Sequence, residues 1–213
     1  MPHVDMHVHT LYSRGDGLAS PEEVIHAAER RGLCGVAITD HDTMDGYRAA
    51  CAIPTSLALI PGCEVSSADG HILSYFVSSP VPPGLSAEET IHAIHAQGGL
   101  AVASHPLDRR RHGVGERAFS LPFDAIEVRN GHNVSTNAET ERRARLAGIP
   151  CIGGTDAHLA REVGSVTTVF PTCGGFADHI RAGRTDVHGA PVSRLTLVEK
   201  ALRTHLLRQS WRA

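Results

Sequence analysis

Short apolar runs alternate with amphipathic stretches along most of the chain. The apolar runs have the length of buried strands and cover residues 3–9, 33–39, 57–66, 71–77, 100–104, 124–129, 150–154 and 163–170. The stretches between and after them show helical periodicity and cover about 20–31, 44–51, 86–97, 137–147, 175–182 and 193–209. Alternating strands and helices are typical of parallel sheets with helices outside. The pattern therefore predicts an α/β barrel of about seven βα units.

Capping and turn residues mark the ends of several elements. The segments Ser20–Glu23 and Ser86–Glu89 have the spacing of a capping box, which predicts a helix start at each. Asp69-Gly70 stands between two strand-like runs and is a hairpin signal. We therefore expect those two strands to be joined by a tight turn.

The composition favours one domain with an aliphatic core. The chain has 213 residues, of which 41% are hydrophobic and only 4% aromatic. We expect a single domain over residues 1–213, with a core at about 3–183 and a C-terminal helix, about 193–209, packed on the flank of the barrel. The formal net charge of -3 argues against binding of long nucleic acid, which usually requires a basic excess.

The cysteines suggest a reducing compartment. Cys34, Cys51, Cys63, Cys151 and Cys173 form no CxxC pair, and most stand in apolar surroundings, so we expect reduced core thiols. The sequence shows no basic-then-apolar leader and no apolar run of membrane-spanning length. We therefore expect a cytoplasmic protein with no membrane partner.

Two imidazoles stand at the end of the first predicted strand. Because side chains alternate along a strand, His7 and His9 point the same way, and Asp156 and His158 repeat this spacing after a later strand. Mixed histidine and carboxylate ligands suit Zn, Mn or Fe(II), and the whole set is enough for two or three divalent ions bridged by a residue such as Glu64. The candidate metal ligands, most of them at strand ends, are His7, His9, Asp16, His41, Glu64, His71, His105, Asp156 and His158.

Several of these residues also have an ordinary structural interpretation. His7 and His9 have the alternative of being hydrogen-bonded core histidines, and Asp16 that of a turn residue. The recurrence of ligand-type residues at successive strand ends favours metal binding. Asp42 or Thr43, next to His41, is expected to cap a helix rather than to bind metal.

Several motifs, in order along the chain, resemble the PHP family, which is named for polymerase and histidinol phosphatase domains. They are Asp5–Ser13, Thr39–Thr43, Pro61–Ser66, Ser104–Pro106, Ile126–Asn130 and Gly154–His158. The resemblance implies a distorted (β/α)7 TIM-like barrel with a trinuclear metal centre at the C-terminal ends of the strands. It assigns the ligands to three metals as follows: His7, His9, Glu64 and Asp156 to the first; Glu64, His71 and His105 to the second; Asp16, His41 and His158 to the third.

The resemblance also implies hydrolysis of a phosphoester. Clustered cations lower the pKa of a bridging water, so that hydroxide forms near neutral pH and attacks phosphorus. Arginine would hold the remaining phosphate oxygens, and the candidates are Arg14, Arg129 and the run Arg109–Arg111, which has the alternative of a solvated face. His132 is the candidate acid for the leaving group.

The function that we favour is a phosphomonoesterase acting on a small phosphorylated metabolite or nucleotide. Alternatives are a histidinol-phosphate phosphatase, an exonuclease on short oligonucleotides, and a metal-binding module with little turnover. The complete ligand set argues against a degenerate module, while the helical insertion common in family phosphatases is short or missing after His71, which leaves the substrate open. An amidohydrolase with a bridging carboxylated lysine is disfavoured, because no lysine precedes Lys200. Self-association through the C-terminal helix is the alternative to packing on the barrel.

Overall fold

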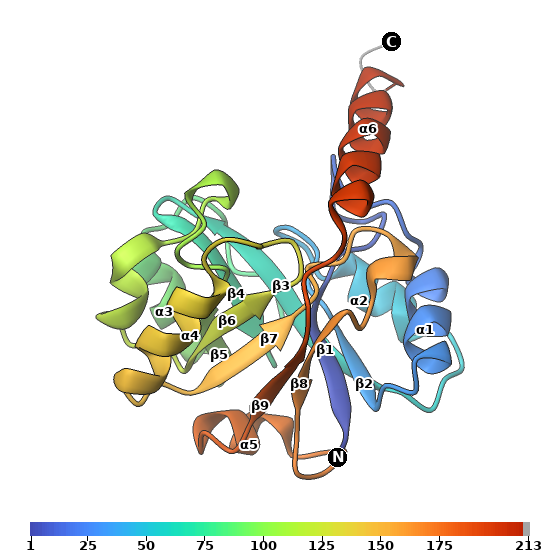
Figure 1. Cartoon of the computed structure of the whole chain (residues 1–213). Helices are drawn as coiled ribbons and strands as arrows, with labels where there is room; N and C mark the ends of the chain where they lie inside the picture. The colour runs from blue at the N-terminus through green and yellow to red at the C-terminus, as the bar shows by residue number, and fades with distance from the viewer. Residues whose placement is uncertain (211–213) are drawn as a thin grey trace.

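The strands of the protein form one sheet that curves into a nearly closed barrel (Figure 1). A computed structural model describes residues 1–210, and its strands are β1 (His3–Val8), β2 (Gly35–Ile38), β3 (Ala58–Ser67), β4 (Gly70–Tyr75), β5 (Leu100–Ala103), β6 (Ala125–Asn130), β7 (Cys151–Gly154), β8 (Val166–Val169) and β9 (Asp186–Gly189). Their order across the sheet is β7-β6-β5-β4-β3-β2-β1-β8-β9. Just beyond β7, Ala157 forms a parallel bridge with Val8 and accepts a hydrogen bond from the His9 amide at 2.8 Å. This closure confirms the predicted TIM-like fold.

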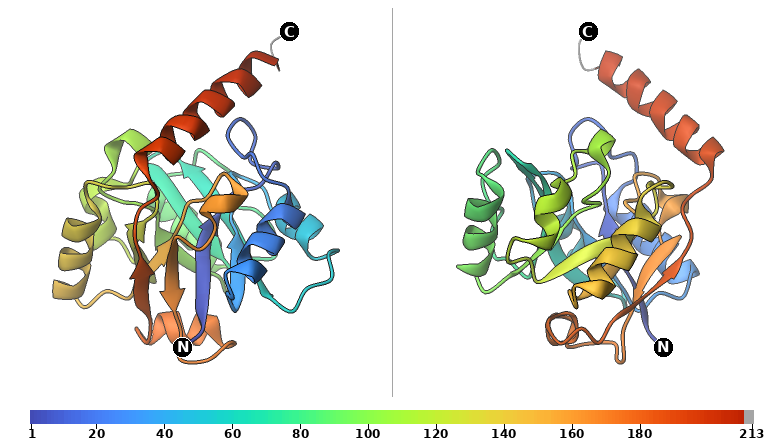
Figure 2. Two further views of the ribbon diagram at one scale, coloured as in Figure 1. Left: turned by 45° about the vertical axis from the view of Figure 1, so that its right-hand side comes forward. Right: turned by 60° about the vertical axis from the view of Figure 1, so that its left-hand side comes forward.

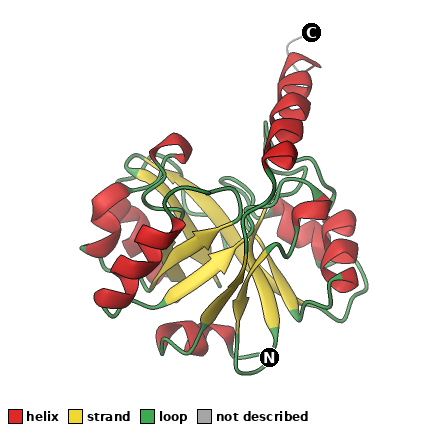
Figure 3. Ribbon diagram, viewed as in Figure 1, coloured by secondary structure: helices red, strands yellow, loops and turns green. Residues whose placement is uncertain are grey.

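Helices lie around the outside of the sheet (Figure 3). They are α1 (Pro21–Arg30), α2 (Asp45–Ala50), α3 (Ala87–His95), α4 (Asn137–Leu146), α5 (Phe176–Arg181) and α6 (Arg194–Ser210). Three short 3-10 helices lie in the connections: η1 (Arg109–Arg111), η2 (Gly115–Phe119) and η3 (Ala160–Glu162). The predicted capping boxes are present at the starts of α1 and α3, where each stabilises the first turn by about 1 kcal/mol.

The strands are not all parallel, so the parallel pairing predicted from the alternation of strands and helices holds only in part. Strands β1, β2 and β3 are parallel, as are β5, β6 and β7, but β4 runs antiparallel to both of its neighbours. The predicted turn at Asp69-Gly70 explains this, because a tight turn can only join antiparallel strands. Strand β8 runs antiparallel to both β1 and β9. Strand β9 was not predicted from the sequence, because Val187 is its single apolar residue.

The close approach of β1 and β7 depends on Gly154. An ideal Cβ on Gly154 would lie 2.4 Å from the Cβ of His7 and 2.6 Å from its amide nitrogen. We expect Gly154→Ala to force the strands apart, lowering the free energy of unfolding by about 1–3 kcal/mol and reducing the bound metal. Urea denaturation and elemental analysis measure the two effects. Gly148→Ala is the control, because a Cβ on Gly148 would have no atom within 4 Å. Its φ of +67° is unfavourable for alanine, so this variant should lower the free energy of unfolding through backbone strain and leave the metal content unchanged.

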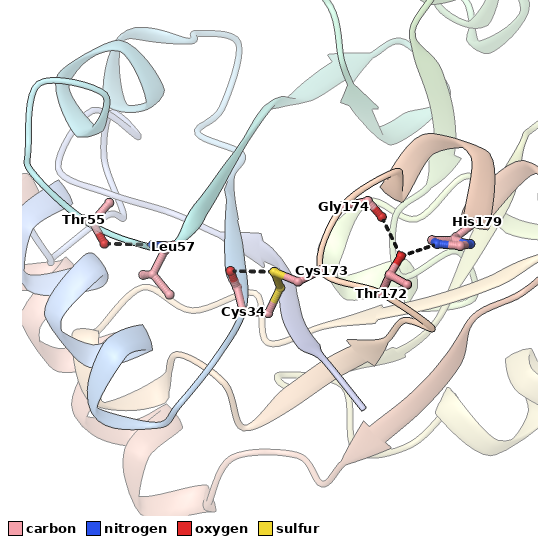
Figure 4. Close-up of a disulfide and its surroundings, with 7 residues drawn as sticks. All are labelled: Cys34, Thr55, Leu57, Thr172, Cys173, Gly174 and His179. Atoms are coloured by element: carbon pink, nitrogen blue, oxygen red, sulfur yellow. Dashed lines mark hydrogen bonds between the residues drawn. A yellow bond between two sulfur atoms is a disulfide. The ribbon is translucent and has the colours of Figure 1, made fainter.

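A disulfide joins the residue before β2 to the loop between β8 and α5 (Figure 4). Cys34 and Cys173 are bonded, with their Cα atoms 6.0 Å apart. For this pair the expectation of reduced core thiols is wrong, whereas Cys63 and Cys151 are free and buried as expected, and Cys51 is free but exposed. The bonded pair is separated by 139 residues, so nothing in the local spacing indicated it.

Helix α6 rises from the barrel and does not lie along its flank (Figure 2). Leu195, Val198 and Leu202 are 82%, 58% and 61% exposed. The predicted packing of this helix on the flank is therefore wrong for the part that the structure describes. The end of the predicted domain, residues 211–213, and the side chains of residues 206–210 lie outside that part. Within residues 1–210, each helix is too short or too polar to cross a membrane.

Candidate metal centre

All nine predicted ligands meet at one end of the barrel. His7 and His9 come from β1 and the residue after it, and His41, His105, Asp156 and His158 follow β2, β5 and β7. Glu64 lies in β3. His71 reaches the same end because β4 starts there, with His71 paired to Ser66 of β3. Asp16 comes from the loop after β1, and it lies beside His158.

The first group of ligand atoms has the spacing of a single coordination sphere. The Nε2 atoms of His7 and His9 are 3.1 Å apart. Glu64 Oε2 lies 3.3 Å from the first and 3.2 Å from the second, and Asp156 Oδ1 lies 3.7 and 3.3 Å from them. Four ligand atoms at about 2.1 Å from one ion stand about 3.4 Å apart in a tetrahedron. The four side chains therefore fit one divalent ion.

Glu64 links this first group of ligands to a second group. Its Oε2 faces His7 and His9, while its Oε1 lies 3.2 Å from His71 Nδ1 and 3.1 Å from His105 Nε2. A carboxylate that offers one oxygen to each of two imidazole groups has the arrangement of a bridging metal ligand. The residues thus fit the second site that the family resemblance implied.

Asp16 is the centre of the third group. Its Oδ2 lies 2.9 Å from His158 Nε2 and 3.5 Å from His41 Nε2. Buried polar atoms without a hydrogen-bond partner cost about 1–3 kcal/mol each, and a bound ion would satisfy them. Among the described residues, such atoms that face the three ligand groups are Asp16 Oδ1, His71 Nδ1 and Asp156 Oδ1.

Two ligands have a backbone conformation that non-glycine residues rarely adopt. His105 has a φ of 28° and Asp156 a φ of 59°. Such residues cost about 1–3 kcal/mol each and persist where the surroundings hold them in place. The strain at these two strand ends aims both side chains into the metal centre.

Electrostatics tie the carboxylates to the imidazoles. Burial alone would raise the pKa of Glu64, but His7, His41 and His71 hold it well below its usual range. Burial likewise opposes the charge on His9, yet hydrogen bonds that its ring donates to the carboxylates of Asp156 and Glu64 raise its pKa to about 9. Imidazoles must lose their protons to bind metal. We therefore expect metal affinity to rise with pH.

Glu127 supports the ligands without being one. Its Oε1 lies 2.9 Å from Nδ1 of His7, and its Oε2 accepts a hydrogen bond from the His105 amide at 2.8 Å. Asn130 also donates to Glu127, at 3.1 Å, and to Asp156, at 3.0 Å. Glu127 lies in the motif Ile126–Asn130, and as a carboxylate in an apolar strand it was expected, with Asn130 as the alternative, to line the pocket.

Replacing Glu127 with glutamine tests this support. The amide keeps the size of the side chain but cannot accept both bonds with the same charge, so His7 should lose its fixed tautomer. We expect metal affinity to fall by about 10- to 100-fold. Competition with a fluorescent chelator measures the affinity, and Glu141→Gln in α4, where Glu141 accepts a bond from Arg129, is the matched control. Unchanged affinity would contradict the supporting role.

Neighbouring acidic residues hold the loops that carry the ligands. Asp40 accepts bonds from the amide and hydroxyl of Thr10, at 2.6 and 2.8 Å. Asp42 accepts from the Ser66 amide at 2.7 Å. The prediction that Asp42 or Thr43 caps a helix is wrong, because α2 has Met44 at its N-cap position and no side-chain cap.

The candidate arginines divide between the centre and the outside. Arg111 forms an ion pair with Asp156 Oδ2, and its Nη1 donates to Asn130 at 3.1 Å. Arg14 is exposed and lines a cavity with His41. Arg129 is held outside, where its Nη2 donates to Glu141 of α4 at 2.8 Å and its Nη1 to the Gly189 carbonyl at 3.2 Å. The structure therefore contradicts the predicted contact of Arg129 with phosphate.

His132 lies beside the third group. Its ring stacks on that of His158 with centroids 5.3 Å apart, and its Nε2 lies 3.3 Å from Glu162 Oε2. Glu162 also accepts bonds from the amides of His158 and Leu159, at 2.8 and 3.0 Å, which fixes the turn after β7.

Sequence comparison places the chain in a family. Residues 5–98 match the PHP domain and residues 134–185 match the PHP-associated region. An uncharacterized protein of Methanocaldococcus jannaschii is 34% identical over 140 residues, which are 61% of this chain and 82% of that protein. The chain belongs to the PHP family. An error-prone DNA polymerase of Mycobacterium tuberculosis is 38% identical to this PHP protein over 66 residues, which are 30% of the chain and 6% of the polymerase.

Solved structures share the PHP fold at low sequence identity. A two-domain protein of Bacteroides vulgatus, described as containing a predicted PHP-like metal-dependent phosphoesterase, has a TM-score of 0.74 at 20% identity, over 95% of this chain and 69% of that one. PsfC of Pseudomonas syringae has a TM-score of 0.75 at 19% identity, over 97% of this chain and 98% of that one. The lesion-specific endonuclease Q of Pyrococcus furiosus has a TM-score of 0.66 at 17% identity, over 87% of this chain and 57% of that one.

Proposed function

We propose that this PHP protein is a metal-dependent phosphomonoesterase that acts on a small phosphorylated metabolite or nucleotide. The observation that supports this most is the carboxylate of Glu64, whose two oxygens face separate groups of imidazoles. Adjacent metal sites suit the hydrolysis of phosphate esters, because several cations together can neutralise the phosphate oxygens.

The three ligand groups would hold two or three divalent ions, Mn²⁺, Zn²⁺ or Fe²⁺. The first group is centred on His7 and His9, the second on His71 and His105, and the third on Asp16. When bound, the ions would lower the pKa of water and neutralise the phosphate oxygens. Mixed nitrogen and oxygen ligands accept each of these metals, so the cell's supply would decide among them.

Other side chains would bind the phosphate and supply a proton. Arg111, beside Asp156, and Arg14, beside the cavity at His41, would contact phosphate oxygens. His132 would donate a proton to the leaving oxygen. Burial lowers the pKa of His132 while the bond to Glu162 opposes the shift, so the protonated ring would be a stronger acid than an exposed histidine.

Cavities beside the centre support a small substrate. One of about 650 Å³ borders His41 and is lined by the exposed Leu11 and Tyr12 together with Arg14. Another of about 450 Å³ borders His71 and contains Arg109 and His112. Sites for small ligands have volumes of about 300–1,000 Å³. The first cavity would take the organic part of a phosphate ester.

Metal analysis combined with a hydrolysis assay tests this function. Protein purified without chelator should contain two or three metals per chain and release phosphate from an aryl phosphate monoester. A bis-aryl phosphate diester, assayed in parallel, should react more slowly. Metal binding without hydrolysis of the monoester would contradict the proposal, and so would faster hydrolysis of the diester.

A nuclease is the second candidate. Its support is the likeness of the fold to endonuclease Q and of the first part of the chain to error-prone DNA polymerases. The net charge of -3 and the small cavities weigh against long nucleic acid. Release of mononucleotides from short oligonucleotides, faster than phosphate from the aryl ester, would favour the nuclease. The cytoplasmic location and the self-association of the protein stay predictions. The preference for another substrate over histidinol phosphate also stays a prediction.

A further inference from the structure

Lys200 is the single lysine among the 213 residues of the chain. It lies in α6, beyond the family matches, which end at residue 185. The proposed mechanism does not use it, and the family resemblance assigns it no role. Its position in the fold nevertheless brings it to the metal centre.

The segment before α6 delivers the helix to the ligand end of the barrel. Strand β9 leads toward that end, and the amide of Ala190 donates to the Ser165 carbonyl at 3.1 Å. The amide of Val192 then donates to the carbonyl of Gly131 at 2.8 Å. Gly131 follows Asn130, which binds Asp156. Helix α6 therefore starts at the rim of the centre (Figure 1).

The second turn of α6 is anchored to η3. Glu199 forms an ion pair with Arg161, at 2.9 Å between Oε1 and Nη1, and Arg161 lies three residues after the ligand His158. Leu195, Val198 and Leu202 are exposed on the helix, whereas Lys200 is half-buried. The face that carries Lys200 is thus turned toward the barrel.

The charges of two ligand groups act on Lys200. Burial lowers its pKa, while the carboxylates of Asp156 and Asp16 oppose this shift and Arg111 adds to it. Asp156 belongs to the first ligand group and Asp16 to the third. Within the described part of the chain, Lys200 has no ion-pair partner within 4.0 Å, so its ammonium group is available to an anion.

We propose that Lys200 is a substrate-binding residue of the metal centre, and that its ammonium group contacts a non-bridging oxygen of the phosphate ester. This rests on the proposed phosphoesterase function. A phosphate monoester carries about two negative charges near neutral pH and a diester carries one. The arrangement therefore favours monoesters, because Lys200 adds a point charge beyond the metals and Arg111.

Amine labelling tests the contact without requiring turnover. Lys200 and the amino group of Met1 are the amines of the chain, and Met1 starts at the opposite end of the barrel (Figure 1). The Mn²⁺-loaded protein is treated with an acetylating reagent at about pH 8, with and without saturating inorganic phosphate, and peptides are quantified by mass spectrometry. Phosphate should slow labelling of Lys200 at least about fivefold and leave Met1 unchanged. Equal labelling of Lys200 in both samples would overturn the proposal.

Variants test the same contact by kinetics. Lys200→Met should raise KM for the aryl monoester about tenfold, with little change for the diester and unchanged metal content. Lys200→Arg should recover part of the loss. Arg194→Met removes the same charge from an exposed position of the helix and should leave KM unchanged.

The two proposals fail in different ways. Wild-type protein that hydrolyses the monoester, beside a Lys200→Met protein with the same KM, would overturn the role of Lys200 and leave the function standing. Wild-type protein that binds metal but hydrolyses no ester would overturn the function. In that case phosphate protection of Lys200 from labelling still decides whether it binds an anion.

Discussion

Asp156→Ala should reduce hydrolysis of an aryl phosphate by about 10³-fold or more, because it removes one ligand from the first metal group. Asp156 Oδ1 lies 3.3 Å from His9 Nε2, and its Oδ2 binds both Arg111 and Asn130. The substitution therefore removes a ligand and also frees the guanidinium from its partner. We expect metal content to fall by at least one ion per chain.

The measurements must distinguish a loss of catalysis from a loss of the folded structure. Removal of one partner of a buried ion pair costs about 3–5 kcal/mol, so thermal unfolding and circular dichroism should accompany the kinetics. Asp156→Asn keeps the shape and serves as the milder variant. Asp178→Ala, at an exposed position in α5, is the control for loss of an aspartate. Wild-type turnover by a folded Asp156→Ala protein with full metal content would rule out the proposed centre.

The meeting of the candidate ligands could be predicted because it depends on local geometry. Alternation along β1 placed His7 and His9 on one face, and their Nε2 atoms are 3.1 Å apart. The strand ends then brought the remaining ligands to the same end of the barrel. Even His71, on an antiparallel strand, fits this rule, since the turn at Asp69-Gly70 returns the chain within a few residues.

Arg129 was misplaced because alternation fails at one point in β6. The register between β6 and β7 shifts between Glu127 and Arg129. Without that irregularity, both side chains would point into the barrel. With it, Glu127 supports His7 while Arg129 pairs with Glu141 outside. A bulge of this kind depends on the neighbouring strand, so the pattern of β6 alone did not indicate it.

The other failures involve partners that are distant in sequence. The apolar positions of α6 predicted a helix of the right length, but not where it points, because that depends on its contact with η3 through Arg161. Cys34 and Cys173 meet only because the barrel brings β2 near the loop after β8. In both cases the sequence indicated the element and not its neighbour.

Arg111→Met should lower kcat/KM for the aryl monoester by about 10²- to 10³-fold, as expected for loss of a preorganised charge on the phosphate. The run Arg109–Arg111 gave no way to choose one arginine. The structure distinguishes them, because Arg111 pairs with Asp156 while Arg109 and Arg110 are exposed. Arg110→Met therefore makes the same change in charge at an exposed position and should leave kcat/KM close to that of the wild-type protein.

The metal content of Arg111→Met tells its two roles apart. If Arg111 mainly orients Asp156, its loss should weaken metal binding along with catalysis. If it mainly binds phosphate, metal binding should be kept or strengthened, because a positive charge beside the cations is removed. Nitrogen atoms of its guanidinium contact Oδ2 of Asp156 and Asn130, whereas Oδ1 of Asp156 faces His7 and His9. We therefore expect the second result, and loss of metal in Arg111→Met would contradict its role as a phosphate ligand.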